Sequence, residues 1–384
     1  MLTTMVEAGD RVSDLFISPG NPPLIETSGQ LTSVKINGLE SLTATHTAGI
    51  AKILIGQNKQ AREDLEKNGS ADISYSVPGL ARFRVNVFMQ RGTHAVVLRV
   101  VTEKPPTFED LKLPEHLKEI AELKNGIVLV TGATGSGKSS TLAAVIDLIN
   151  EIKKYHIITV EDPIEFIHQH KNSAVHQREL HSDTTSFASA LRAALRQAPK
   201  VILVGEMRDR ETVETALEAA ETGHLVLSTL HTVNASKTVN RIIGIFPKNE
   251  EQSIRMRLAH SFRYIISQRL LPRADGKGRI AALEILKSTS RTREYIEKGE
   301  SEGKSITDAM EDGATEGMQT FDGVLENMIR EGVITVSQGL VYATNANNLQ
   351  LRISDLSKSP KPIVEEEPNT DINGSMLDEI ELNG

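Results

Sequence analysis

The chain has 384 residues, of which 39% are hydrophobic and 24% are charged, a balance typical of globular proteins. This length predicts two or three domains, each large enough to bury a core of its own. The formal net charge of -8 disfavours a dedicated duplex-binding protein, because phosphate contacts need a basic surface. The absence of cysteine excludes disulfides, thiolate zinc sites and thiol catalysis.

Integral membrane segments are not predicted, because no apolar run approaches the roughly 18 residues that a transmembrane helix needs. Residues 1–14 include Glu7, Asp10 and Asp14, and they lack the basic and apolar regions of a secretory signal. We therefore expect a cytoplasmic protein.

Residues 1–103 mix helical and strand patterns, which predicts a small α+β domain. Apolar and polar residues alternate before and after Gly92, as in the two strands of a hairpin. The elements expected in chain order are a short opening helix, a strand at 15–18, a helical stretch over 45–67, and hairpin strands at 83–90 and 95–101.

A stretch with three prolines, residues 104–117, follows this block. Proline fixes φ and cannot donate a backbone hydrogen bond, so the stretch predicts a linker or a strap between domains. Residues 118–356 then alternate short β-branched runs with helical stretches, which predicts a parallel sheet covered on both faces in an α/β domain. Strands are expected at 127–130, 157–160, 201–204 and 225–227, helices at 138–150, 186–197, 211–222 and 235–243, a hairpin over 268–286, and a mostly helical remainder.

The end of the chain differs in composition. Residues 357–384 carry seven acidic residues and two lysines, so their net charge is 2 − 7 = −5. Few apolar residues and many charges predict a disordered tail. A purely solvating role is the simplest interpretation, and partner binding by residues 376–382 is the alternative.

The sequence GATGSGKS at residues 132–139 matches the phosphate-binding pattern GxxxxGK[ST] and lies between a predicted strand and a predicted helix. Gly135 and Gly137 let backbone N–H groups face phosphate oxygens, and the following helix N-terminus favours negative charge. Lys138 is expected to bridge the β- and γ-phosphates, and Ser139 to ligate Mg²⁺. The expected nucleotide-binding residues are Thr134, Gly135, Ser136, Gly137, Lys138, Ser139 and Ser140.

Carboxylates follow two of the predicted strands. Glu206 comes after the strand at 201–204, where it is expected to orient or deprotonate the attacking water, or to act through Mg²⁺. The sequence EDPIE at 161–165 follows another strand. Three carboxylates so close together favour a divalent cation or polarised water among them, with a solvated acidic loop as the alternative.

Two histidines, His224 and His231, flank the predicted strand at 225–227. The chain has no HExxH sequence and no cysteine, so a zinc site is disfavoured. A strand that ends beside the nucleotide would place a histidine as a γ-phosphate sensor, and a structural histidine is the alternative.

Four segments together resemble the Walker A, Asp box, Walker B and His box of the secretion ATPases, the motors of type II secretion and type IV pili. These segments are GATGSGKSS from residue 132, ITVEDPIEFIH from 158, VILVGEMRD from 201 and TGHLVLSTLHTVNA from 222. Over residues 1–356 the chain is most similar to the PilT/PilU retraction ATPases. The resemblance implies a PAS-like N-terminal domain, a RecA-like P-loop domain and a homo-hexameric ring that uses ATP and Mg²⁺ for pilus retraction and twitching motility.

The resemblance also implies roles for individual residues. Glu206 becomes the catalytic glutamate, while Glu161 and Glu165 help to hold Mg²⁺ or the catalytic water. Ser139 and Glu161 are then the metal ligands.

The resemblance implies that His231, together with His224, senses the nucleotide state. Arginines of the N-terminal domain reach the nucleotide in this family, and Arg84 and Arg99 on the predicted hairpin match best. An arginine clamp would neutralise charge in the transition state, whereas the alternative is an ordinary polar hairpin face. The competing choices are Arg82 and Arg91.

One departure concerns the C-terminal region, where principal PilT motors carry an AIRNLIRE-type segment. Residues 288–299 read STSRTREYIEKG instead, which favours an accessory, PilU-like ATPase that depends on a paralogous retraction motor. The implied partners are the pilus platform protein of the inner membrane and that paralogue, with no nucleic acid. The alternatives are a pilus-assembly or type II secretion ATPase, a ring that binds ATP without hydrolysing it alone, and, from a different class, a nucleic-acid-dependent RecA-like motor.

Overall fold

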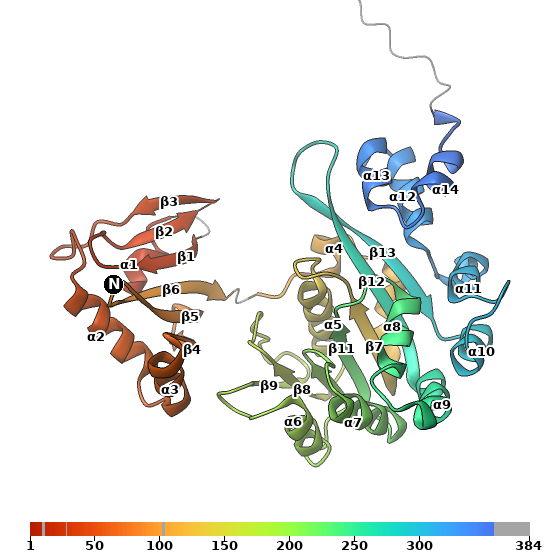
Figure 1. Cartoon of the computed structure of the whole chain (residues 1–384), viewed down its shortest axis with the longest axis horizontal. Helices are drawn as coiled ribbons and strands as arrows, with labels where there is room; N and C mark the ends of the chain where they lie inside the picture. The colour runs from red at the N-terminus through yellow and green to blue at the C-terminus, as the bar shows by residue number, and fades with distance from the viewer. Residues whose placement is uncertain (10–11, 28, 102–103, 357–384) are drawn as a thin grey trace, which may run out of the picture.

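The computed structural model describes residues 1–9, 12–27, 29–101 and 104–356. A small N-terminal unit built on one sheet is followed by a larger unit built on a second sheet (Figure 1). The predicted acidic tail at 357–384 lies outside the described residues. No helix in the described part of the chain is both long and apolar enough for a membrane crossing.

The N-terminal unit is an antiparallel sheet with the strand order β3-β2-β1-β6-β5-β4. Its core contains Leu15, Phe83 and Leu98, which are fully buried and pack with apolar residues of the helices. The expected α+β organisation is therefore present. The elements are α1 (Leu2–Val6), β1 (Val12–Ile17), β2 (Leu24–Thr27), β3 (Gln30–Ser33), α2 (Ala44–Ile55), α3 (Lys59–Asn68), β4 (Ser70–Val77), β5 (Ala81–Gln90) and β6 (Thr93–Val101).

The prediction of one helical stretch over 45–67 is wrong, because the structure has two helices there. Gly56 ends α2 with a positive φ of 54°, which favours glycine. The side chain of Asn58 then caps α3 by accepting a hydrogen bond from the N–H of Ala61 at 3.0 Å.

The larger unit contains a sheet with the order β13-β12-β7-β11-β10-β8-β9, in which only the β12–β13 pair is antiparallel. The predicted parallel sheet is thus confirmed. The edge strand β9 was not predicted, because its sequence AVHQRE has no apolar run. The strands are β7 (Gly126–Thr131), β8 (His156–Glu161), β9 (Ala174–Glu179), β10 (Val201–Val204), β11 (Leu225–Leu230), β12 (Phe262–Pro272) and β13 (Arg279–Lys287).

Helices cover both faces of this sheet, as the doubly apolar strands predict. One face carries α4 (Phe108–Leu111), the 3₁₀ helix η1 (Glu115–Glu122) and α5 (Lys138–Ile152). The other carries α6 (Phe187–Ala194), α7 (Arg210–Glu221), α8 (Ala235–Ile243), α9 (Glu251–Ser261), α10 (Ser290–Lys298) and α11 (Ile306–Asp312). A separate core joins the β12–β13 hairpin to α12 (Phe321–Arg330), α13 (Val336–Tyr342) and α14 (Ala346–Arg352). Two further 3₁₀ turns are η2 (Lys248–Glu250) and η3 (Ala314–Glu316).

The expected linker at 104–117 is packed rather than free from residue 108 onward. Phe108, Leu113 and Leu117 are buried in the core that α5 shares with the sheet. This segment therefore acts as a strap on the larger unit.

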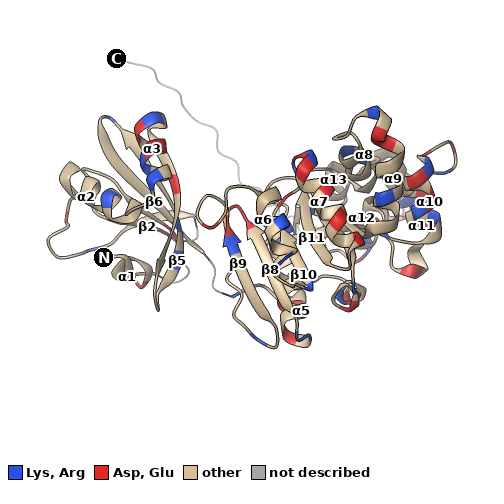
Figure 2. Cartoon of the chain, turned by 90° about the horizontal axis from the view of Figure 1, so that it is seen from below, with Lys and Arg blue, Asp and Glu red and all other residues tan. Residues whose placement is uncertain are grey.

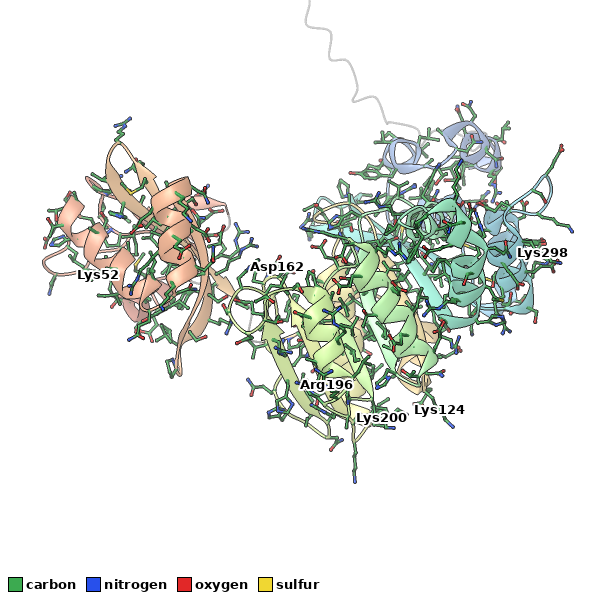
Figure 3. All side chains as sticks on the ribbon, turned by 60° about the horizontal axis from the view of Figure 1, so that its bottom comes forward. Lys52, Lys124, Asp162, Arg196, Lys200 and Lys298 are labelled. Carbon is green, nitrogen blue, oxygen red and sulfur yellow. The ribbon has the colours of Figure 1, made fainter. Side chains whose placement is uncertain are left out.

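The parallel strands define two opposite edges of the sheet. Asp162 follows β8 at the carboxyl edge, toward the N-terminal unit (Figure 3). Lys124 and Lys200 precede β7 and β10 at the opposite edge in the same view. Ligands of open α/β sheets bind at the carboxyl edge, so the search for a site begins there.

Candidate functional site

A cavity of about 480 Å³ lies at the carboxyl edge of the parallel sheet. The structure brings all four sequence motifs to its wall through side chains of the phosphate loop, the acidic loop after β8 and the ends of β10 and β11. The predicted residues that line it are Thr134, Gly135, Gly137, Lys138, Ser139, Ser140, Glu161, Glu165, Glu206 and His231. Predicted residues up to 97 positions apart in sequence, from Thr134 to His231, thus share one site.

The phosphate loop has the backbone shape that its glycines allow. Gly135 and Gly137 have φ values of 77° and 90°, and Gly137 caps the N-terminus of α5. A Cβ atom at Gly137 would lie 2.8 Å from Nε2 of Gln268, so a side chain there would have to displace this amide group and adopt a φ that favours glycine. Ser136 is predicted to bind nucleotide, and its Oγ is buried without a hydrogen-bond partner. An unpartnered donor in such a loop fits an anionic ligand.

The side chain of Lys138 points into the phosphate loop. Its Nζ donates hydrogen bonds of 3.0 Å to the backbone oxygens of Gly132 and Ala133. Burial lowers the pKa of Lys138, whereas the negative charges of Glu165 and Glu206 oppose that shift. A partly buried cation held only by two carbonyl oxygens is a good partner for phosphate oxygens.

Glu206 is the buried carboxylate of the site. Its Oε1 pairs with Nη2 of Arg208, and its Oε2 lies 3.6 Å from Nε2 of His231. Burial, followed by the positive charge of Lys138, lowers the pKa of His231, so its ring is neutral near pH 7. A carboxylate beside a neutral imidazole can hold and deprotonate a water molecule.

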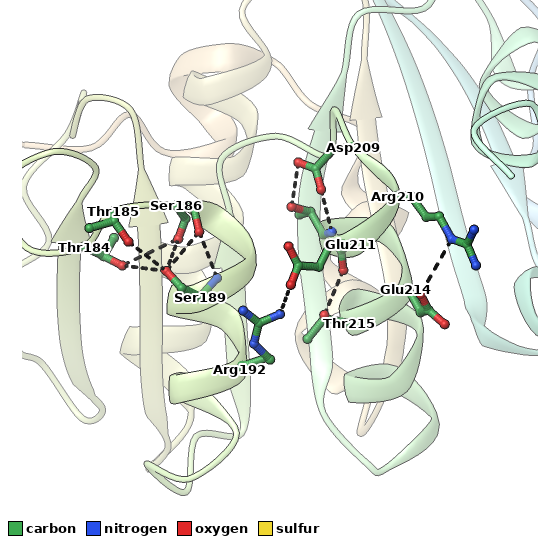
Figure 4. Close-up of polar contacts among 11 residues, drawn as sticks. Thr184, Thr185, Ser186, Ser189, Arg192, Asp209, Arg210, Glu211, Glu214 and Thr215 are labelled. Atoms are coloured by element: carbon green, nitrogen blue, oxygen red, sulfur yellow. Dashed lines mark hydrogen bonds and ion pairs between the residues drawn. The ribbon is translucent and has the colours of Figure 1, made fainter.

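The segment after Glu206 is fixed by a helix cap (Figure 4). Asp209 accepts hydrogen bonds from the N–H and the hydroxyl group of Thr212, both at 2.9 Å, at the start of α7. The backbone N–H of Gly205 also bonds to the oxygen of Val160 at 2.8 Å. Glu206 therefore extends from a short segment that is held at both ends.

Glu161 is held by two side-chain donors. The hydroxyl of Thr159 lies 2.6 Å from its Oε1 and Nε2 of Gln177 lies 3.1 Å from the same atom. Burial raises the pKa of Glu161. Ser139 and Glu161 line the same cavity, and their hydroxyl and carboxylate oxygens are the hard donors that Mg²⁺ prefers. The described residues contain no cluster of three or more metal-binding side chains.

His224 is not among the residues that line the cavity, and its role as a sensor of the nucleotide state stays a prediction. It precedes β11, and its backbone oxygen accepts a hydrogen bond from the N–H of Gly126 at the amino edge of the sheet. Its Nδ1 atom lies 3.0 Å from the backbone oxygen of Ala219. The sequence pattern placed both histidines at strand ends, but it did not show which of them lies at the amino edge of the sheet and which at the carboxyl edge.

Arg84 and Arg99 also stand apart from the cavity lining. They lie directly opposite each other on β5 and β6, and Arg99 Nε bonds to Oδ1 of the buried Asp14 at 2.8 Å. Their expected approach to the nucleotide is therefore not found in this structure. Arg82, the competing choice, instead contacts the larger unit through Glu179 at 2.9 Å.

The cavity contains further polar residues that the sequence analysis did not select. Arg208 stood inside the quoted VILVGEMRD segment, whereas nothing around Arg279 at the start of β13 distinguished it. His168 ends the quoted ITVEDPIEFIH segment without a predicted role, and it is buried and lines the cavity. These three side chains add two cations and one imidazole to the site.

His168 gives a prediction for stability. Burial lowers its pKa from 6.5 to about 4. Between these values the unfolded chain binds a proton that the folded chain does not, so the free energy of unfolding falls as the pH falls. The shift corresponds to about 3 kcal/mol between pH 7 and pH 4. Denaturant unfolding of His168→Gln should show a pH dependence weaker by this amount than the wild type.

The matched control is His260→Gln at an exposed position of α9. It should keep the pH dependence of the wild type. Equal slopes for wild type and His168→Gln would contradict the placement of a neutral, buried histidine here.

Comparison with known proteins agrees with this geometry. Residues 67–294 match the family described as Type II/IV secretion system protein. The type IV pilus retractation ATPase PilT of Pseudomonas aeruginosa is 44% identical over 323 residues, covering 84% of this chain and 92% of that protein. The type IV pilus ATPase PilU of the same organism is 43% identical over 359 residues, covering 94% of this chain and 92% of that protein.

A solved structure gives the same picture in three dimensions. The crystal structure of the pilus retraction motor PilT with bound ADP matches with a TM-score of 0.81 at 42% identity. The match covers 91% of this chain and 98% of that one, so it includes both sheets. With this fold, this cavity and these relatives, the chain belongs to the Type II/IV secretion system protein family.

Proposed function

We propose that this protein is an ATP-hydrolysing motor that drives type IV pilus retraction and thereby twitching motility. The observation that carries the proposal is the cavity in which the phosphate loop, Glu206 and His231 meet. Support for the biological process comes from the relatives PilT and PilU and from the PilT structure with ADP.

In the proposed reaction, backbone N–H groups of the loop at 132–139 and the ammonium group of Lys138 bind the β- and γ-phosphates of ATP. Glu206 orients a water molecule and accepts its proton as the water oxygen attacks the γ-phosphorus. The bond between the γ-phosphorus and the ADP oxygen breaks in the same step. Arg208 and Arg279 lie where they can balance the charge on the transferred group.

Ser139 and Glu161 would hold Mg²⁺, with Glu165 holding the ion or a water molecule beside it. When bound, the ion screens the charge of the phosphate oxygens. His231, close to both Glu206 and Lys138, would report whether the γ-phosphate is present.

The larger assembly is part of the same proposal. We take the working unit to be a homo-hexameric ring at the cytoplasmic face of the inner membrane, where it acts on the pilus platform protein. Closure of one unit on another would bring Arg84 or Arg99 to the nucleotide, where their positive charge would balance the phosphate oxygens.

An accessory role beside a paralogous motor is the second candidate. Helix α10 has the sequence SRTREYIEK in place of the AIRNLIRE-type segment. The relative PilU also covers 94% of this chain. Mixing the purified protein with a paralogous retraction ATPase should raise ATP turnover above the sum of the separate rates if this role holds.

A deletion strain tests the direction of the motor. Loss of a retraction motor should leave hyperpiliated cells that do not twitch, because assembly continues while retraction stops. Electron microscopy of surface pili, together with a twitching assay, measures both properties, and the gene restored in trans is the control. Cells without pili would instead support an assembly motor and contradict retraction.

A further inference from the structure

Arg82 links the N-terminal sheet to the edge strand of the larger sheet. Its Nη2 atom lies 2.9 Å from Oε2 of Glu179, and the two side chains are 23% and 5% exposed. In Figure 2, β5 lies next to the ends of β8 and β9. The low exposure distinguishes this pair from exposed surface ion pairs, which contribute little to the free energy of unfolding.

The same oxygen of Glu179 has a second donor. It accepts a hydrogen bond of 3.1 Å from the backbone N–H of Ile164. Ile164 lies between Glu161 and Glu165, whose side chains line the nucleotide cavity. A single oxygen atom therefore joins the N-terminal sheet to the loop that carries the carboxylates of the site.

Strand β9 holds this loop at a second point. Gln177 lies two residues before Glu179, so both side chains are on the same face of the strand. Its amide group donates to Oε1 of Glu161 at 3.1 Å and to the oxygen of Phe166 at 2.9 Å, and accepts from the N–H of His168 at 2.8 Å. The shape of residues 161–168 thus depends on the position of β9.

Arg82 makes fewer hydrogen bonds than its guanidinium group allows, as expected for a contact that can break and re-form. Its Nε atom is buried without a hydrogen-bond partner, and its Nη1 atom has only a long contact of 3.4 Å to Oγ of Ser76. A guanidinium group bound through one nitrogen lacks the second bond of a bidentate pair. Such a contact is easier to break when the N-terminal unit moves.

We propose that Arg82 is a positioning residue for ATP hydrolysis, which acts through Glu179 and Ile164 on the carboxylates of residues 161–165. With the contact formed, the loop holds Glu161 and Glu165 toward the nucleotide. Movement of the N-terminal unit breaks the contact and loosens the loop. The inference rests on the proposed function, because it takes the cavity to be the site of hydrolysis.

Arg82→Gln tests this role with two readouts. We expect kcat for ATP to fall about tenfold while KM changes less than about threefold, because the loss affects alignment more than binding. Hydrogen exchange of peptides covering 161–168 should become faster in the same variant. Arg82→Lys keeps the charge and should recover part of both properties.

The control is Arg62→Gln at an exposed position of α3, where the Arg62 side chain donates to the backbone oxygen of Gly56. It should leave the kinetics and the exchange unchanged. The exchange measurement does not require hydrolysis. A wild-type protein without ATPase activity would therefore refute the proposed function, while unchanged exchange in Arg82→Gln would refute the positioning role by itself.

A charge swap separates positioning from simple attachment of the two units. The double variant Arg82→Glu with Glu179→Arg restores an ion pair, but the new side chain at 179 cannot accept the hydrogen bond from Ile164. We expect kcat to stay low and the loop to keep exchanging fast. Recovery of wild-type kcat would show that the pair only attaches the two units, and it would overturn the proposal.

If the double variant does not fold, Glu179→Gln replaces it. Glutamine can still accept the hydrogen bond from the N–H of Ile164, but it carries no charge to pair with Arg82. Wild-type kcat and wild-type hydrogen exchange in this variant would also overturn the proposal.

Discussion

Lys138→Ala is expected to reduce ATP hydrolysis by about 100-fold or more and to remove most nucleotide binding. The reason is the position of Nζ, which now bonds to two loop oxygens and is the cation best placed to meet phosphate oxygens in the cavity. Phosphate release by the purified variant and retention of a labelled ATP analogue measure the two effects. Far-ultraviolet circular dichroism should show an unchanged fold.

The matched control is Lys124→Ala, an exposed lysine just before β7 at the opposite edge of the sheet. It should hydrolyse ATP at the wild-type rate. Near-wild-type turnover by Lys138→Ala would show that the loop at 132–139 does not bind the reacting phosphates.

Glu206→Gln is expected to keep nucleotide binding within a few-fold but to lower turnover by about 10²- to 10⁴-fold. Glutamine has almost the same shape as glutamate and can still contact Arg208, but it cannot accept the proton of the attacking water. Binding of a labelled ATP analogue and steady-state phosphate release distinguish the two effects.

Glu211→Gln on α7 is the control for this substitution, because the Glu211 side chain forms an exposed ion pair with Arg192. Its kinetics should match the wild type. A Glu206→Gln variant that still turns over ATP at the normal rate would assign the proton acceptor elsewhere, and one that fails to bind nucleotide would make Glu206 a binding residue.

The parts of the fold that follow from local sequence were predictable. The strands at 127–130 and 201–204 are continuous apolar runs buried on both faces, and the helix after Lys138 follows directly from its phosphate-loop context. The edge strand β9 could not be predicted in this way, because an edge strand faces solvent and its residues Gln177 and Glu179 serve the neighbouring loop instead of a core.

The site residues were predictable where a known sequence motif lies directly after a predicted strand. Lys138 and Glu206 follow from motifs at strand ends, since the carboxyl ends of parallel strands meet at one edge. The position of His224 could not be fixed, because a residue before a strand and one after it look alike in sequence but lie at opposite edges. The partner of Arg82 could not be predicted from the sequence either, because Arg82 and Glu179 are 97 positions apart.

The most direct test of the account is the structure of the Glu206→Gln variant with ATP and Mg²⁺ bound. We predict a triphosphate on the backbone N–H groups of residues 132–139, with its γ-phosphate between Lys138 and the side chain at 206 and the metal ion next to Ser139. Density for the nucleotide at another surface, or a cavity that stays without nucleotide at saturating ATP, would contradict the claim that this site cleaves ATP.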